Sequence, residues 1–101
     1  MQHQSITKQL EIMDKAKFFN QFVILNDFLE GYKATDDEKK RAKQMKFTTF
    51  FELYDDDDNK YYSGYMHEDI EDEFEPQDWG MYYAGCTYSK VRSSNGKMEM
   101  L

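Results

Sequence analysis

The chain has 101 residues, and its 13 lysines and arginines against 20 aspartates and glutamates give a formal net charge of −7. Hydrophobic residues make up 40% of the chain and aromatic residues 17%, which excludes a disordered acidic tail and predicts one folded domain over residues 1–101. A chain of this size buries about 60–65% of its unfolded surface and has little room for a substrate cavity beside its core, and its negative charge disfavours direct binding to nucleic acid or to a membrane surface.

Residues 1–46 carry helical patterns. Ser5 is a suitable N-cap, and an apolar stripe at helical spacing leads from there to Gly31, a suitable residue beyond a helix C-terminus. The stripe consists of Ile6, Leu10, Met13, Phe19, Phe22, Val23 and Leu29. The segment can form one helix or two helices separated near Asp14.

A further helix is predicted over residues 36–46. Thr35 and Glu38 have the spacing of a capping box, in which each side chain accepts a hydrogen bond from the other residue's backbone N–H. The first turn holds Asp36 and Asp37, and the later turns hold lysines and an arginine. This order suits the helix dipole, so we interpret these charges as structural, and a second partner contact through the basic residues is left open.

From residue 47 onward the sequence pattern repeats at every second residue, as in a β-strand, and no longer at helical spacing. Residues 47–54 and 61–67 predict two strands, joined by the polar run of residues 55–59. A second hairpin is predicted over residues 81–101, because Asn95-Gly96 is a strong hairpin-turn dipeptide.

Residues 67–78 connect the two hairpins. Within them, Ile70 and Phe74 can hold one helical turn that Pro76 ends. The element order predicts an α+β fold, with two or three N-terminal helices packed on one face of an antiparallel sheet of about four strands in two hairpins. Residues 1–46 are then helical, and residues 47–101 form the sheet with its acidic loop segments.

Acidic residues are concentrated in residues 52–78. This segment holds twelve acidic residues and one base, Lys60, a balance of −11, whereas the remaining 74 residues carry a balance of +4. Because dispersed charge is sufficient for solubility, this concentration favours a surface that attracts a basic partner over a merely solvated loop. Tyrosine and tryptophan are residue types that anchor interfaces. The predicted partner-binding residues are Asp55, Asp56, Asp57, Asp58, Tyr62, Tyr65, Glu68, Asp69, Glu71, Asp72, Glu73, Glu75, Asp78 and Trp79.

The sequence gives little support for a catalytic, metal-binding or phosphate-binding site. Residues 55–59 begin like a calcium loop, but Lys60 occupies the position of its glycine and Met66 the position of its bidentate carboxylate. His67 is followed by two acidic residues, yet neighbouring residues on a strand point to alternate faces and do not converge on one metal ion. No glycine-rich phosphate loop is present. We therefore predict no catalytic residue, no metal site, no cofactor and no enzymatic activity.

Cys86 is the only cysteine, which excludes an intrachain disulfide and a cysteine-rich zinc site. We interpret it as a small packing residue. The longest apolar run is interrupted by polar residues and is shorter than the roughly 20 residues of a membrane span. The N-terminus also lacks the pattern of a secretory signal, so we expect a cytoplasmic protein.

Two stretches resemble a known class of proteins. They are the strand-flanked loop Asp55-Asp-Asp-Asp-Asn-Lys-Tyr-Tyr and the terminal segment Ser94-Asn-Gly-Lys-Met-Glu-Met-Leu. With the small size and the clustered carboxylates, they resemble small acidic phage-encoded inhibitors of host defence, which include anti-CRISPR proteins, antirestriction proteins and uracil-DNA glycosylase inhibitors. The resemblance implies a DNA mimic, whose acidic face occupies the basic groove where a nuclease or CRISPR effector holds nucleic acid.

We therefore predict an inhibitor whose partner is a basic nucleic-acid-binding protein. An immunity protein or antitoxin against a basic toxin nuclease would have the same surface properties, because both act by acidic occlusion. The other alternative is a small phage structural or assembly protein that forms a homodimer through a tyrosine-rich sheet edge.

Overall fold

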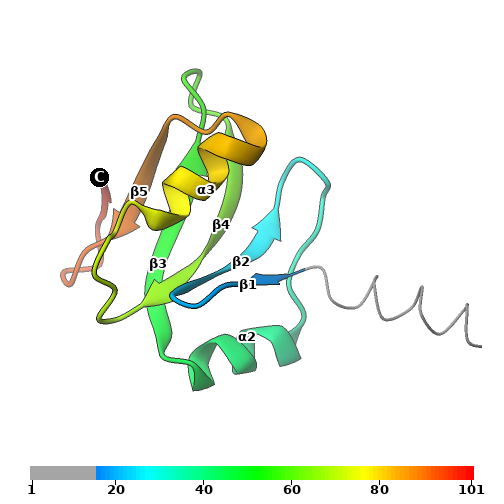
Figure 1. Ribbon diagram of the computed structural model, residues 1–101, viewed down its shortest axis with the longest axis vertical. Helices are drawn as coiled ribbons and strands as arrows, with labels where there is room; N and C mark the ends of the chain where they lie inside the picture. Colours follow the sequence, from blue (N-terminus) through cyan, green and yellow to red (C-terminus); the bar gives the residue numbers. More distant parts are fainter. Residues whose placement is uncertain (1–15) are drawn as a thin grey trace, which may run out of the picture.

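A computed structural model of the chain describes residues 16–101, which form an antiparallel six-stranded sheet and two helices (Figure 1). The predicted α+β class is confirmed, with more strands and a different helix arrangement than expected. Along the chain the elements are β1 (Lys17–Phe18), β2 (Phe22–Asp27), α2 (Asp36–Gln44), β3 (Phe47–Tyr54), β4 (Lys60–His67), α3 (Glu75–Ala84), β5 (Tyr88–Arg92) and β6 (Met98–Met100). Across the sheet the strand order is β1-β2-β4-β3-β5-β6.

The two predicted hairpins are present where their turn residues place them. Strands β3 and β4 pair in antiparallel register from Phe47 opposite His67 to Tyr54 opposite Lys60, with the acidic run between them. Strands β5 and β6 pair around a turn in which Gly96 has a φ of 87°, a conformation that glycine adopts without a Cβ clash. The second hairpin is shorter than predicted, since β5 begins at Tyr88 and not at residue 81.

The prediction that residues 1–46 are helical is wrong for the described residues that precede α2. Residues 17–27 form β1 and β2, and the part of the prediction that rests on Ser5, Ile6, Leu10 and Met13 lies outside the described residues. The four residues from Phe22 to Leu25 are all buried because β2 is covered on both faces. Alternate side chains of a strand point to opposite faces, so a fully apolar run supplies apolar side chains to both covered faces of the sheet.

The segment around Pro76 is a helix and not a helical turn followed by a strand. Pro76 stands in the first turn of α3, where its missing N–H removes no helical hydrogen bond and its fixed φ suits the helix. Helix α3 continues through residues 81–84, which were predicted as strand, and Gly85 ends it with a left-handed φ of 78°.

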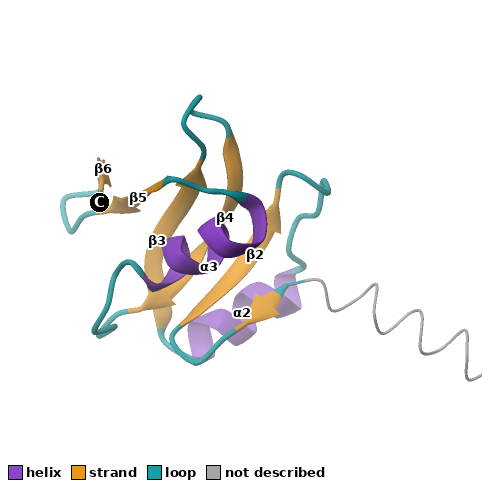
Figure 2. Cartoon of the chain, turned by 45° about the horizontal axis from the view of Figure 1, so that its top comes forward, coloured by secondary structure: helices purple, strands orange, loops and turns teal. Residues whose placement is uncertain are grey.

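The helices cover opposite faces of the sheet, which corrects the prediction that they share one face. Figure 2 shows α3 in front of the sheet and α2, drawn fainter, behind it. On the α3 side a buried cluster forms around Phe22, Ile24, Phe51 and Leu53. On the α2 side a second cluster is built from Ala16, Val23, Leu25, Ala42 and Phe47. Neither helix of residues 16–101 has the length and apolar content needed to cross a membrane.

Helix α2 begins with the predicted capping box. The Thr35 hydroxyl accepts a hydrogen bond from the Glu38 backbone N–H at 3.1 Å, and the Glu38 carboxylate accepts one from the Thr35 N–H at 2.9 Å. The same carboxylate accepts hydrogen bonds from the Tyr32 hydroxyl and from the Ala16 N–H at 3.3 Å. One buried side chain therefore joins α2 to the loop before it and to the residue that precedes β1.

The close pairing of β2 and β4 depends on Gly64. A Cβ at this position would lie 1.9 Å from the carbonyl oxygen of Val23, which is backbone and cannot move aside without shifting a strand. We expect Gly64→Ala to lower the free energy of unfolding by about 3 kcal/mol or more in urea denaturation. The exposed-turn variant Ser94→Ala is the control and should change it by less than about 0.5 kcal/mol. Equal stability of the two variants would contradict this account.

The buried carboxylate of Glu38 predicts a dependence of stability on pH. Burial alone would raise the pKa of Glu38, but the hydrogen bonds from Tyr32, Thr35 and Ala16 outweigh it and hold the pKa below the ordinary value of 4.5. A carboxyl with a lowered pKa in the folded state stabilises the fold above its unfolded pKa and loses that contribution as the pH falls through its folded pKa. We expect Glu38→Gln to lower the free energy of unfolding by about 1–2 kcal/mol at pH 7. The difference from wild type should shrink as the pH falls from 5 towards 2, and a difference that is constant over this range would refute the role assigned to the charge.

Candidate functional site

The acidic run at the tip of the β3–β4 hairpin is partly used to hold its own loop. One oxygen of Asp55 accepts hydrogen bonds from the backbone N–H groups of Asp57 and Asn59, both at 2.9 Å. The other oxygen accepts from the Asn59 amide at 3.1 Å and from the Tyr61 hydroxyl at 2.9 Å. These bonds, above all that from the Asn59 backbone, lower the pKa of Asp55. Asp55 is thus a structural residue of the loop.

The other three aspartates of the tip differ in whether their carboxylates already have a partner within the protein. Asp58 has a positive φ of 64° and accepts a hydrogen bond from the Tyr88 hydroxyl on β5, which raises the pKa of Tyr88 to about 12. Asp56 and Asp57 are exposed, and within residues 16–101 their carboxylates have no hydrogen-bonding or ion-pair partner. Two of the four predicted aspartates are therefore free to meet a partner.

The second acidic segment, residues 68–78, lies at the opposite end of the same hairpin (Figure 1). Strand β4 has eight residues, and at a rise of ~3.3 Å per residue its ends are roughly 23 Å apart. The structure therefore does not bring the predicted acidic residues into one patch. The exposed carboxylates of this segment belong to Glu68, Asp69, Glu71, Asp72, Glu73, Glu75 and Asp78.

The three aromatic residues predicted as anchors are placed in or against the protein interior. The Tyr62 side chain is buried in the core on the α3 side. The Trp79 ring packs against it with 4.8 Å between ring centroids and so holds α3 on the sheet. Tyr65 lies on the opposite face beside Phe50, with their ring centroids 5.3 Å apart. None of the three is among the exposed residues.

Helix α3 instead presents apolar side chains that the sequence prediction missed. Phe74, Met81, Tyr82 and Tyr83 are exposed by 48, 53, 81 and 67%. Large apolar side chains on one exposed helix, surrounded by polar residues, are typical of an interaction site. The sequence signal was the position of Pro76, which fits the start of a helix that runs through this segment.

We define the α3 surface as Phe74, Glu75, Asp78, Met81, Tyr82 and Tyr83. Residues 68–85 contain seven acidic residues and no lysine or arginine. The first turn of α3 is acidic and its last turn has no base, so the carboxylates near these apolar side chains are not neutralised from within the helix. The surface thus combines exposed rings with uncompensated negative charge.

The residues considered for metal binding do not assemble a site in the described structure. No group of three or more histidine, cysteine, aspartate or glutamate side chains within residues 16–101 is arranged to hold a metal ion. The His67 Nδ1 atom accepts a hydrogen bond from the Asp69 backbone N–H at 2.9 Å. The oxygens of Asp55, the first residue of the calcium-like motif, accept hydrogen bonds from N–H groups of their own loop and from the Tyr61 hydroxyl on β4.

Comparisons with protein-family models, with curated proteins and with solved structures find no match to this chain. The resemblance to phage-encoded inhibitors therefore stays a prediction.

Cys86 provides a chemical test of how α3 docks. The thiol is fully buried and lies at the close approach of α3 to the sheet, where a Cβ on Gly80 would lie 3.0 Å from its sulfur. Burial raises the pKa of Cys86 to about 11. Since the thiolate is the reactive form, we expect the native thiol to react with a disulfide reagent at pH 8 at least about 100-fold more slowly than in denaturant. Fast reaction in the native state would show that α3 does not stay docked, and Cys86→Ser is the blank.

Proposed function

We propose that this chain is an inhibitor that binds a basic surface of another protein through the α3 surface. The observation that carries the proposal is the coincidence of exposed Tyr82, Met81 and Phe74 with carboxylates that have no basic neighbour on the same helix. Exposed rings contribute binding energy when they are desolvated, and the charges select and steer the partner. A basic partner is favoured because it compensates the carboxylates that it buries.

The class of partner follows from the distribution of charge. The hairpin tip and residues 68–78 offer negative charge at two places separated by roughly the length of β4. A groove that holds nucleic acid carries lysines and arginines along such a length, because each strand of a duplex presents one phosphate per about 3.4 Å of the helix axis. We therefore propose a nuclease or CRISPR effector as the partner, with the chain occupying the place of the nucleic acid. Asp56 and Asp57 would make the second contact.

The proposal is tested by a charge-reversal pair with a matched control. The variant Glu75→Lys/Asp78→Lys changes two acids in the first turn of α3, and the control Asp36→Lys/Asp37→Lys makes the same change in the first turn of α2. Both variants lose the same helix-dipole interaction, so their stabilities should fall by similar small amounts. The two pairs lie on helices that cover opposite faces of the sheet.

We expect the wild-type chain to displace duplex DNA from at least one member of a panel of purified restriction endonucleases and CRISPR effectors. Displacement should weaken as salt is raised. The α3 pair should weaken binding by about 100-fold or more, and the α2 pair by less than about threefold. Tyr82→Ala should weaken binding without changing its salt dependence. Equal losses of binding in both charge-reversal variants would show that net charge alone causes the effect. If the chain displaced DNA from no member of the panel, the proposal would be wrong.

A further inference from the structure

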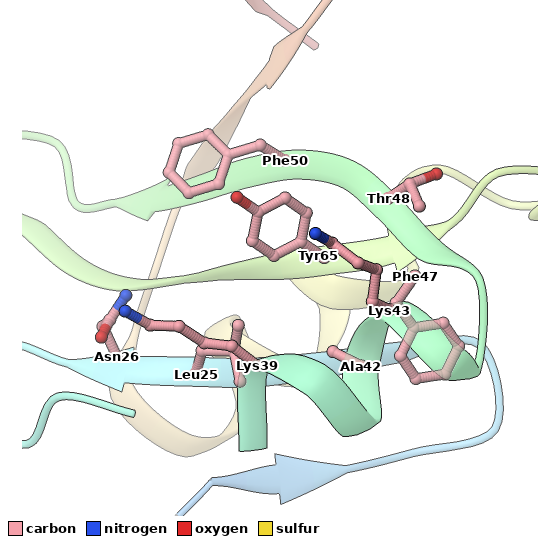
Figure 3. A pocket seen from close by; sticks show the side chains of 9 residues that line it. All are labelled: Leu25, Asn26, Lys39, Ala42, Lys43, Phe47, Thr48, Phe50 and Tyr65. Carbon is pink, nitrogen blue, oxygen red and sulfur yellow. The ribbon is translucent and has the colours of Figure 1, made fainter. Parts of the chain in front are cut away.

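A groove on the opposite face of the sheet is basic, in contrast to the acidic α3 surface. Helix α2 covers only part of this face and leaves a depression of about 430 Å³ between itself and the strands (Figure 3). Its floor and walls include Leu25 from β2, Phe47 and Phe50 from β3, Tyr65 from β4, and Lys39 and Lys43 from α2. A volume of this size is within the range of small-molecule sites.

Two lysines of α2 face this groove. Lys39 and Lys43 are four residues apart and so lie on one side of the helix, and Figure 3 shows both side chains extending over the depression towards the strands. In the part of the chain that the structure describes, the one ion pair joins Lys60 to Glu52 at 2.8 Å. Neither groove lysine therefore has a carboxylate within ion-pair distance there. The groove holds positive charge without an internal counter-charge, in a chain whose net charge is −7.

The floor of the groove is aromatic and is extended by a third cation. Phe50 and Tyr65 lie on the neighbouring central strands β3 and β4, with ring centroids 5.3 Å apart and planes inclined by 60°. The Arg92 guanidinium carbon on β5 lies 4.7 Å from the centre of the Phe50 ring. Aromatic rings on central strands next to cations are the arrangement with which sheet surfaces stack bases and neutralise phosphates.

We propose that this groove binds a mononucleotide, with its phosphates on Lys39 and Lys43 and its base against Phe50 and Tyr65. Phosphate alone would not use the aromatic floor, and an uncharged aromatic ligand would leave the lysines without a counter-charge. A long nucleic acid would extend beyond the basic groove, where the net negative charge of the chain repels it. The proposal is independent of the α3 surface, because α2 and α3 lie on opposite faces.

The experiment is an NMR titration of the full ¹⁵N-labelled chain with ATP, AMP, adenosine and inorganic tripolyphosphate at low salt. We expect saturable binding of ATP with a Kd between about 10 μM and 1 mM, weaker binding of AMP, and the weakest binding of adenosine and of tripolyphosphate. Shifts should centre on the amides of β3, β4 and α2 that line the groove. Tripolyphosphate binding as tightly as ATP would overturn the role of the aromatic floor.

Two double variants, each of which removes two lysine charges, distinguish binding in the groove from binding elsewhere on the surface. Lys39→Gln/Lys43→Gln should weaken ATP binding by about tenfold, whereas Lys33→Gln/Lys40→Gln, which removes two exposed lysines outside the groove lining, should change it by less than about twofold. Phe50→Leu should weaken ATP binding and leave tripolyphosphate binding unchanged. Equal losses in both lysine pairs, or no saturable ATP binding, would overturn the proposal. A thymidine decanucleotide that binds more than tenfold tighter than ATP would overturn it in favour of single-stranded nucleic acid.

Discussion

The burial of β2 on both of its faces is the constraint from which the rest of the fold follows. Phe22 and Ile24 need apolar neighbours on one side of the sheet, and Val23 and Leu25 need them on the other. A sheet with one solvated face cannot satisfy this run. The chain therefore needs a helix over each face, and it needs the close β2–β4 pairing that Gly64 permits.

The covering helices are short, and this decides what the two faces present to solvent. Helix α2 has nine residues and α3 has ten, against a sheet of six strands. On the α2 side a cation extends the aromatic floor of the groove, in the contact of Arg92 with Phe50. On the α3 side the helix itself carries exposed rings and carboxylates. The groove beside α2 thus presents lysines, whereas the exposed surface of α3 presents carboxylates.

Sequence reasoning succeeded where a feature depends on neighbouring residues only. The Thr35 cap and the Asn95-Gly96 turn were predicted because the hydrogen bonds and dihedral angles that define them are local. The run at Phe22 could not be assigned to a strand by its pattern, because four apolar residues fit a buried helix equally well until the covering elements are known. Pro76 is similarly ambiguous, since proline both ends and begins helices. The acidic segment was found by counting charge, but its apolar residues were missed because the pattern of residues 81–84 predicts a strand.

The position of Trp79 has a spectroscopic consequence. It is the only tryptophan of the chain, and its ring lies between α3 and the sheet, 4.8 Å from Tyr62 and 5.8 Å from Phe19 between ring centroids. The tryptophan fluorescence of the protein, excited selectively, therefore reports on the seating of α3 on the sheet. A change that lifts the helix from the sheet exposes the indole to water and moves its emission to longer wavelength.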